Sequence, residues 1–433
     1  MDIKNASGPS NYEHMTIDKD GTRVNFVDLD NKITVINFSY YESLLFPHVT
    51  ANVIYTDLGN AVSANKNQDV SERRGTILNS LPIKGNEKFE FIINSKLGKL
   101  DFKSYPLYVT AATSPKQESL REATMLSLSS RAAIENETTT IYKKYYNNIG
   151  ETVNQILTKE LHVPSNKLTV EKTKNSYAFT GSSKTAFSLI YSLCPKSIPV
   201  QGSAGFLFWE NKVGFNFRSI DSLISAPPVA TYQYYGVATS SFDNDKNDYR
   251  IYSYNVQKNQ NLLSALKSGV YKTKNIFFNP YSFEYSEIYL SLSKAGLVNL
   301  GSKPEYSGEF DAKDSFTRIH HFILDSGNMD IGISTSLNND PREYQAKSVM
   351  RYNLMMTQVL TMMIPCNPNL KAGDVINCEF EKITFSNKSE GELDESQSGK
   401  YLIMHLCHNF DTKRSFTSLT LVRDTYGLYT GGG

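Results

Sequence analysis

The sequence is poor in cysteine, has no excess of charge of either sign and contains no long apolar run. Its four cysteines are scattered and form no CxxC pair, so free thiols in a reducing compartment are expected rather than a disulfide framework. Lys and Arg (45) nearly balance Asp and Glu (44), and this excludes the strong positive field of a dedicated nucleic-acid-binding protein. Without a run of about 18 apolar residues, no membrane span is expected. The N-terminus lacks the apolar stretch of a secretory signal, which predicts a soluble protein made in a cytoplasm.

Length and aromatic content indicate several β-rich domains. A chain of 433 residues is too long for one compact core, so roughly two to four domains are expected. The aromatic residues are 27 Tyr and 23 Phe against a single Trp. Tyr and Phe are typical of strands, where they suit a pleated, half-buried surface.

Residues 1–114 are predicted to form an antiparallel β-barrel domain. Residues 1–20 are polar, and a flexible N-terminal arm is expected there. Beyond the arm, β-branched and aromatic runs with partial alternation predict strands, and no helical pattern of any length appears before residue 115. The predicted strands are 33–40, 49–55, 88–94, 100–103 and 107–112.

Residues 115–228 are predicted to form an α+β domain. Apolar residues at helical spacing predict helices over 150–161 and 182–193, the second capped by Ser182 or Ser183. Segments 206–209 and 213–217 have the pattern of a hairpin. Consecutive prolines at 227–228 mark the expected end of this domain.

Residues 229–433 predict a second β-barrel domain with an inserted segment at about 260–345. A helix is expected after Asp340, an N-cap residue followed by proline. The polar, acidic stretch 387–399 predicts a flexible loop. A faint repeat, a Lys/Gly turn before a strand ending in Glu-Phe, suggests that the two β domains are similar. Strands are predicted at 358–364, 375–380, 401–410 and 416–423.

The densest group of metal-ligand types lies in the stretch GKYLIMHLCHNF, at His405, Cys407 and His408. Because side chains alternate along a strand, His405 and Cys407 are predicted to share a face with Tyr401 and Ile403. Three ligands from this stretch cannot converge, so the wall of a barrel is favoured over a metal site. No catalytic, cofactor-binding or metal-ligating residues are predicted anywhere in the chain, and no enzyme. His408 is predicted to face the core with Leu402, Met404, Leu406 and Phe410.

Several motifs, taken in order, resemble the central baseplate hub proteins of contractile-tailed phages and the related hub part of type VI secretion spikes. The C-terminal block carries the clearest likeness, as LKAGDVI, SGKYLI, His408 and LTLVRD. Earlier segments also fit the pattern, namely LPIKG at 81–85, GFLFWENKVGFNFRSI at 205–220 and the helix before the last strands.

The resemblance implies a structural virion protein that acts as a homotrimer. Each chain of such a hub carries two tube-type β-barrel domains, so that three chains match a sixfold tail tube while remaining threefold toward the spike. Implied partners are the tail tube protein, the central spike protein and other baseplate proteins, with DNA only in transit through the channel. The implied location is the tail baseplate of a virion assembled in the host cytoplasm.

Polar residues on alternating strands are the candidates for lining that channel. Asn37, Asn52, Asn377 and Glu379 are the residues predicted to face it. Two other functions stay open from the sequence. One is a tail-associated cell-wall hydrolase, and the other is a glycan- or receptor-binding tail protein, which the many tyrosines would suit as readily as they suit subunit interfaces.

Overall fold

The computed structural model describes residues 6–27, 33–58, 76–81, 83–118, 121–234, 247–258, 261–280, 282–292, 295–300, 318–324, 340–382 and 393–425. The fold is mainly β with α+β parts, as the sequence predicts. Within these ranges every helix is too short or too polar to span a bilayer.

The N-terminal β unit is a curled antiparallel sheet with one short helix, α1 (Ile77–Ser80). All five strands predicted in this region are present, and the structure adds a pair at the start and one at the end. The strands are β1 (Asn11–Lys19), β2 (Thr22–Asn25), β3 (Ile33–Ser43), β4 (Thr50–Asp57), β5 (Lys88–Ser95), β6 (Gly98–Asp101), β7 (Leu107–Glu118) and β8 (Arg121–Ser129).

The C-terminal β unit continues the same sheet. Its strands are β14 (Thr231–Tyr234), β15 (Ser253–Lys258), β19 (Gln358–Pro365), β20 (Val375–Phe380), β21 (Gly399–Asp411) and β22 (Ser415–Arg423). Strand β21 pairs antiparallel with β3, so the order β15-β19-β22-β21-β3-β4-β8-β7-β5-β1-β2 runs unbroken through both units. Strand β20 branches from β21, and β14 pairs with β20 in parallel.

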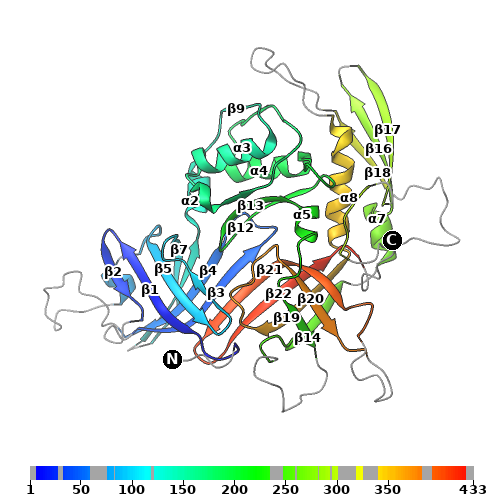
Figure 1. Cartoon of the computed structure of the whole chain (residues 1–433). Helices are drawn as coiled ribbons and strands as arrows, with labels where there is room; N and C mark the ends of the chain where they lie inside the picture. Colours follow the sequence, from blue (N-terminus) through cyan, green and yellow to red (C-terminus); the bar gives the residue numbers. More distant parts are fainter. Residues whose placement is uncertain are drawn as a thin grey trace.

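An α+β unit covers the sheet from one side (Figure 1). Here the helix predicted at 150–161 is α3 extended by a π-helical turn, Ile156–Glu160. The elements are α2 (Arg131–Thr138), β9 (Lys144–Tyr145), α3 (Ile149–Gln155), β10 (Leu168–Val170), β11 (Phe179–Thr180), α4 (Ala186–Leu193), β12 (Phe206–Asn211), β13 (Gly214–Ser219) and α5 (Ile220–Ile224).

The segment between β15 and β19 forms a small unit of its own beside the sheet (Figure 1). It comprises α7 (Leu262–Ser268), β16 (Lys272–Asn279), β17 (Glu284–Ser291), β18 (Arg318–Ile323), a 3₁₀ turn (Pro341–Glu343) and α8 (Gln345–Met355). Asp340 caps the 3₁₀ turn, its side chain accepting a hydrogen bond from the Arg342 N–H at 2.9 Å. Tyr344 then separates this turn from α8, so the predicted helix is present but begins in two steps.

Two details of the α+β region differ from the sequence expectations. Helix α4 begins after Thr185, and Ser182 and Ser183 do not cap it because both have left-handed backbone angles (φ 51° and 60°) in the preceding turn. The expected domain boundary at residue 114 falls inside β7, and β8 still pairs with β4 and β7. The first part of the polar insert 387–399 lies outside the described residues.

The faint sequence repeat corresponds to two similar turns. In the first, the Lys84 N–H donates to the Glu87 carboxylate at 2.8 Å, and in the second the Lys371 N–H donates to Asp374 at 3.1 Å. Each acidic residue directly precedes a strand, β5 or β20. Both turns contain a glycine with positive φ, and a Cβ on Gly373 would lie 2.8 Å from the Trp209 ring.

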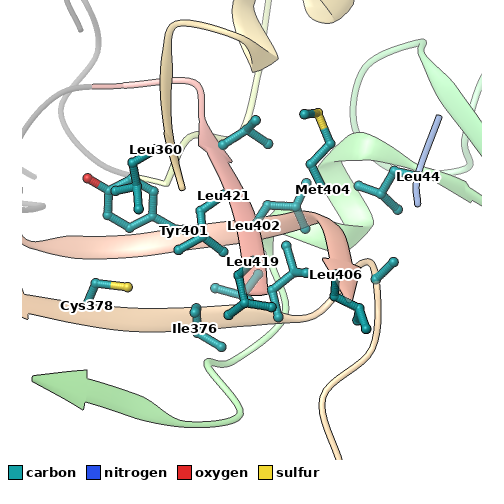
Figure 2. Packing of buried hydrophobic residues seen from close by; sticks show 14 of the residues in the cluster. Leu44, Leu360, Ile376, Cys378, Tyr401, Leu402, Met404, Leu406, Leu419 and Leu421 are labelled. Atoms are coloured by element: carbon teal, nitrogen blue, oxygen red, sulfur yellow. The ribbon is translucent and has the colours of Figure 1, made fainter. Parts of the chain in front are cut away.

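Each β unit encloses its own apolar core. The N-terminal core is rich in aromatic side chains from β3, β4 and β5, and Phe410 of β21 reaches into it. The C-terminal core gathers side chains of β19–β22, and Figure 2 shows Leu402, Leu406, Leu419 and Leu421 close to Ile376. The two curled units therefore share a sheet while keeping separate cores.

A buried ionic group joins three units. Arg351 of α8 is fully enclosed, and its guanidinium lies 2.8 Å from carboxylate oxygens of both Asp221 in α5 and Asp424 after β22. The remaining carboxylate oxygens accept backbone N–H groups of Ser203 (2.7 Å) and Leu300 (3.0 Å). A fully buried charge requires such pairing, because removing one partner leaves a buried ion without its counter-charge.

Substitution Arg351→Met should therefore destabilise the fold strongly. Two carboxylates would be left buried without their cation, and the expected loss is about 3–5 kcal/mol in the free energy of unfolding measured by urea denaturation. The matched control is Arg342→Met. Its ion pair with Asp340 is on the surface, so a loss of less than about 1 kcal/mol is expected. Equal losses in the two variants would contradict this role of Arg351.

Candidate functional site: an uncharged polar face of the sheet

One face of the large sheet points away from both cores and carries small polar side chains. The strand registers place them in continuous rows across both β units. We call this set the polar sheet face: Asn37, Ser39, Tyr41, Ser43, Thr50, Asn52, Ser127, Ser253, Asn255, Thr361, Met363, His405, Cys407, Asn409, Ser418 and Thr420.

The residues assigned to the polar sheet face include no Lys, Arg, Asp or Glu, but charged residues lie at its margins on the same side of the sheet, such as Lys258 opposite Val359 of β19. Partial burial lowers the pKa of His405, which keeps this imidazole neutral at physiological pH, and its Nδ1 lies 2.7 Å from the Ser43 hydroxyl. The first charged side chain along β21 is Asp411, paired with Asn37 at the end of the row. A hollow of about 620 Å³ lies over β15, β19, β22, β21 and β3.

Two of the four predicted channel-lining residues lie on this face. Asn37 donates to the Asn409 side chain at 2.9 Å, Asn409 donates to Ser39 at 3.0 Å, and Ser39 donates back to Asn37 at 2.8 Å. Asn52 stands opposite Ser39 on the next strand. Asn37 and Asn52 thus lie on the side of the sheet away from the core, and their place in a channel stays a prediction. The partner of Asn37, Asn409, lies 372 positions away in the sequence, whereas Asn52 pairs with Ser39 and Ser127 of neighbouring strands.

Asn377 and Glu379 form a separate group on β20. The Asn377 amide lies 3.3 Å from Glu379, whose other oxygen accepts from Gln233 of β14 at 2.5 Å. The next residue on the same side of β20 is Val375, which pairs with Leu402 of β21. Both side chains are fully buried. The structure therefore does not bring these two residues together with Asn37 and Asn52.

A β-bulge changes the predicted faces of the GKYLIMHLCHNF strand. Ile403 pairs with Leu421 and His405 pairs with Thr420, so Met404 is an extra residue without a partner on β22. The bulge reverses the alternation, and Tyr401 and Ile403 consequently share the core face with Leu406, His408 and Phe410. The prediction that Tyr401 and Ile403 lie with His405 and Cys407 is wrong. The prediction that His405 and His408 face opposite ways is confirmed.

His408 is a core residue. Its ring stacks on Tyr40 at 6.2 Å between centroids, Nδ1 lies 2.9 Å from the Thr417 hydroxyl, and Nε2 lies 3.4 Å from the Leu370 carbonyl. Burial, with a smaller contribution from the nearby Lys212 ammonium, lowers the pKa of His408 to about 3. The imidazole is therefore neutral and supports the fold by hydrogen bonding.

Two buried glutamates at the junction of the units were not selected from the sequence. Glu42 of β3 accepts hydrogen bonds from the backbone N–H groups of Lys212 (2.6 Å) and Ala372 (2.7 Å) and from the Tyr40 hydroxyl (2.9 Å). Glu210 of β12 accepts from the Val49 N–H at 3.0 Å. Burial raises the pKa of Glu42 to about 7 and that of Glu210 to about 8. The signal was present, since Glu42 falls on the same alternating face of β3 as the apolar Phe38 and Tyr40.

No family model and no curated protein matches the sequence. Solved structures do share its fold. The tail protein of Neisseria meningitidis MC58 is 11% identical and matches with a TM-score of 0.50 over 94% of this chain and 96% of its own. The 43 kDa tail protein of prophage MuSo2 from Shewanella oneidensis is 9% identical, with a TM-score of 0.52 over 95% and 98%. This chain therefore shares the fold of these two tail proteins, in agreement with the family resemblance noted in the sequence.

The neutral, buried state of His408 predicts an acid-sensitive fold. In the unfolded chain this histidine binds a proton near its ordinary pKa of about 6.5, whereas the buried ring does so only near 3. Its contribution to stability is therefore present above about pH 6.5 and is lost as the pH falls toward 3, with a slope of up to about 1.4 kcal/mol per pH unit. Urea denaturation of the wild type and His408→Gln between pH 4 and 8 measures it. A variant with the wild-type slope would contradict the assignment.

Proposed function

We propose that this protein is a structural component of a phage tail baseplate, a homotrimeric hub that joins the sixfold tail tube to the threefold spike and forms part of the DNA channel. The observation that carries the proposal is the continuous sheet through two β units, with a face of mainly neutral polar side chains. The likeness of fold to tail proteins supports the same role.

The two β units supply the symmetry that such an adaptor requires. Three chains with two units each present six, which suits a sixfold partner on one side and a threefold partner on the other. Pairing of β3 with β21 holds the two units of one chain in a fixed relation. The proposed partners are the tail tube protein, the central spike protein and other baseplate proteins, within a virion assembled in the host cytoplasm.

The absence of charged side chains among the members of the polar sheet face suits a wall along which DNA passes. Lys and Arg would bind phosphates with the release of counterions and would hold the duplex, while a row of carboxylates would repel it. Hydroxyl and amide groups bind water but neither hold the phosphates nor repel them. In this proposal Asn37 and Asn52 face the channel, and Asn377 and Glu379 belong to its lining only where β20 reaches the lumen.

A non-enzymatic role is part of the proposal. Raised carboxyl pKa values often mark acid–base chemistry in a cleft. Here the two glutamates with this property are fully enclosed, and both oxygens of Glu42 and one oxygen of Glu210 accept backbone N–H groups of neighbouring units. Such carboxylates hold units together and are unavailable to a substrate such as peptidoglycan.

The oligomeric state provides the direct test. We expect a mass of three chains, each 48.7 kDa, in light scattering of the protein alone at high concentration or mixed with the adjoining spike protein. Electron microscopy of the assembly should show a threefold ring with an open centre. A chain that stays monomeric with the spike protein present would overturn the hub proposal.

Positive charge introduced on the polar sheet face should make the channel retain DNA. The double variant Asn52→Lys/Thr361→Lys adds one cation to each β unit, six per trimer. Fluorescence anisotropy with a short duplex should reveal binding that weakens as salt rises from about 50 to 300 mM, because phosphate contacts release counterions. The control is Val200→Lys/Val213→Lys, which adds equal charge at exposed positions of the α+β side of the molecule. Equal binding by both double variants would contradict the channel assignment.

A further inference from the structure

The small sheet β17-β16-β18, here called the arm, uses one of its faces to attach to the rest of the molecule. Thr273, Asn275 and Phe277 of β16 are fully buried on this inner face, and Phe277 stacks on Phe322 with ring centroids 5.1 Å apart. Leu290 of β17 belongs to an apolar cluster with α8 residues. The arm is therefore firmly seated beside α8 (Figure 1).

The opposite face of the arm is apolar and lies in solvent. The registers place its side chains in three rows across the sheet: Tyr289–Lys274–Ile319, Glu287–Ile276–His321 and Tyr285–Phe278–Ile323. Phe283 in the adjoining turn packs against Phe278 at 6.1 Å between ring centroids and extends the surface. We call the apolar members the arm patch: Ile276, Phe278, Phe283, Tyr285, Tyr289, Ile319 and Ile323.

The exposure of the arm patch is exceptional within this protein. Phe283, Tyr285 and Ile323 are 77%, 70% and 70% exposed, the highest values of any large apolar side chain in the described part of the chain. A sheet with one face on a core normally carries polar residues on the other face. A contiguous apolar surface of this kind marks an interaction site.

Two charged residues that lie between the members of the arm patch, Lys274 and Glu287, neutralise each other. The Lys274 ammonium lies 2.8 Å from Glu287, and the Tyr289 hydroxyl donates to the same carboxylate at 2.8 Å. The surface thus offers no charge of one sign to attract a strongly acidic or basic partner. A nearly neutral surface suits a nearly neutral partner, and this chain has a net charge of +1.

The size of the arm patch indicates how it is used. Ile276 and Phe278 are partly buried, and the other five side chains are between 47% and 77% exposed. At the 150–250 Å² that a large side chain can bury, these five offer roughly 600 Å². A stable pair of proteins requires about 800 Å² on each partner. The arm patch alone is too small to hold a dimer. In a closed ring the same contact occurs at every interface, where it adds to the other contacts between neighbouring chains.

We propose that the arm patch docks on a neighbouring copy of this chain in the ring. The inference rests on the proposed trimer and names a surface that stabilises it. Because a threefold ring has head-to-tail interfaces, the arm patch of one copy meets a different surface of the next.

The test uses the full chain, with the spike protein present in all samples if the ring requires it. In the double variant Tyr285→Ser/Ile323→Ser, the concentration at which half of the chains are trimeric should rise at least tenfold in mass photometry. Tyr142→Ser is the matched control, since this tyrosine of the α+β side is 68% exposed and should leave assembly unchanged. Thermal unfolding of the monomers verifies that each variant is folded.

Hydroxyl-radical footprinting of the wild type gives a second readout that needs no variant. Oxidation of Phe283, Tyr285 and Tyr289 should fall on assembly, while that of Tyr142 stays constant. A double variant that assembles like the wild type, or arm residues equally oxidised in monomer and ring, would overturn the arm contact and leave the hub proposal standing. A wild type that never trimerises would overturn both.

Discussion

The architecture depends on the pairing of β3 with β21. These strands lie in opposite halves of the chain, yet their hydrogen bonds turn two curled β units into one sheet. Glu42 of β3 strengthens this junction, because its carboxylate accepts backbone N–H groups from both the β12–β13 turn and the turn before β20. Since each acceptor oxygen is buried, a shift that broke these hydrogen bonds without admitting water would leave a buried polar group unpaired, at a cost of about 1–3 kcal/mol. The N-terminal, α+β and C-terminal units therefore hold one another in place.

The junctions hold buried ionic groups, whereas the members of the polar sheet face are neutral. Arg351, Asp221 and Asp424 form a closed ionic group between α8, α5 and the end of β22. Burying these ions costs desolvation free energy, and what the arrangement provides in return is a defined geometry between units. The polar sheet face carries neutral hydroxyl and amide groups instead. The proposed channel would require both properties, a rigid wall and a surface that does not retain a polyanion.

Strand positions were largely predictable because alternation with a period of two leaves a clear mark in runs such as ITVINFSY and TANVIY. Asn37 and Asn52 were selected in this way as channel-lining residues, which stays a prediction. Asn377 and Glu379 show the same alternation but lie on β20, a branch of the sheet, and no local pattern reveals a branch. The bulge at Met404 was equally invisible, since one extra residue reverses the facing of every residue beyond it while the letters remain apolar. The exposed apolar residues of the arm were missed because a pattern of apolar residues does not show which side of a sheet packs against the rest of the protein.

The sequence by itself determined the fold class, the position of most strands, the helices of the α+β region and the likeness to tail hub proteins, because these rest on local periodicity and on motifs in order. Only the tertiary structure decided that both β units form one sheet, that two glutamates and one arginine lie buried between units, and that the arm leaves an apolar face in solvent. Each of these is a contact between residues far apart in the chain. Such contacts are selected by complementary surfaces and by the requirement that buried polar groups find partners, and neither condition is written in any short stretch of residues.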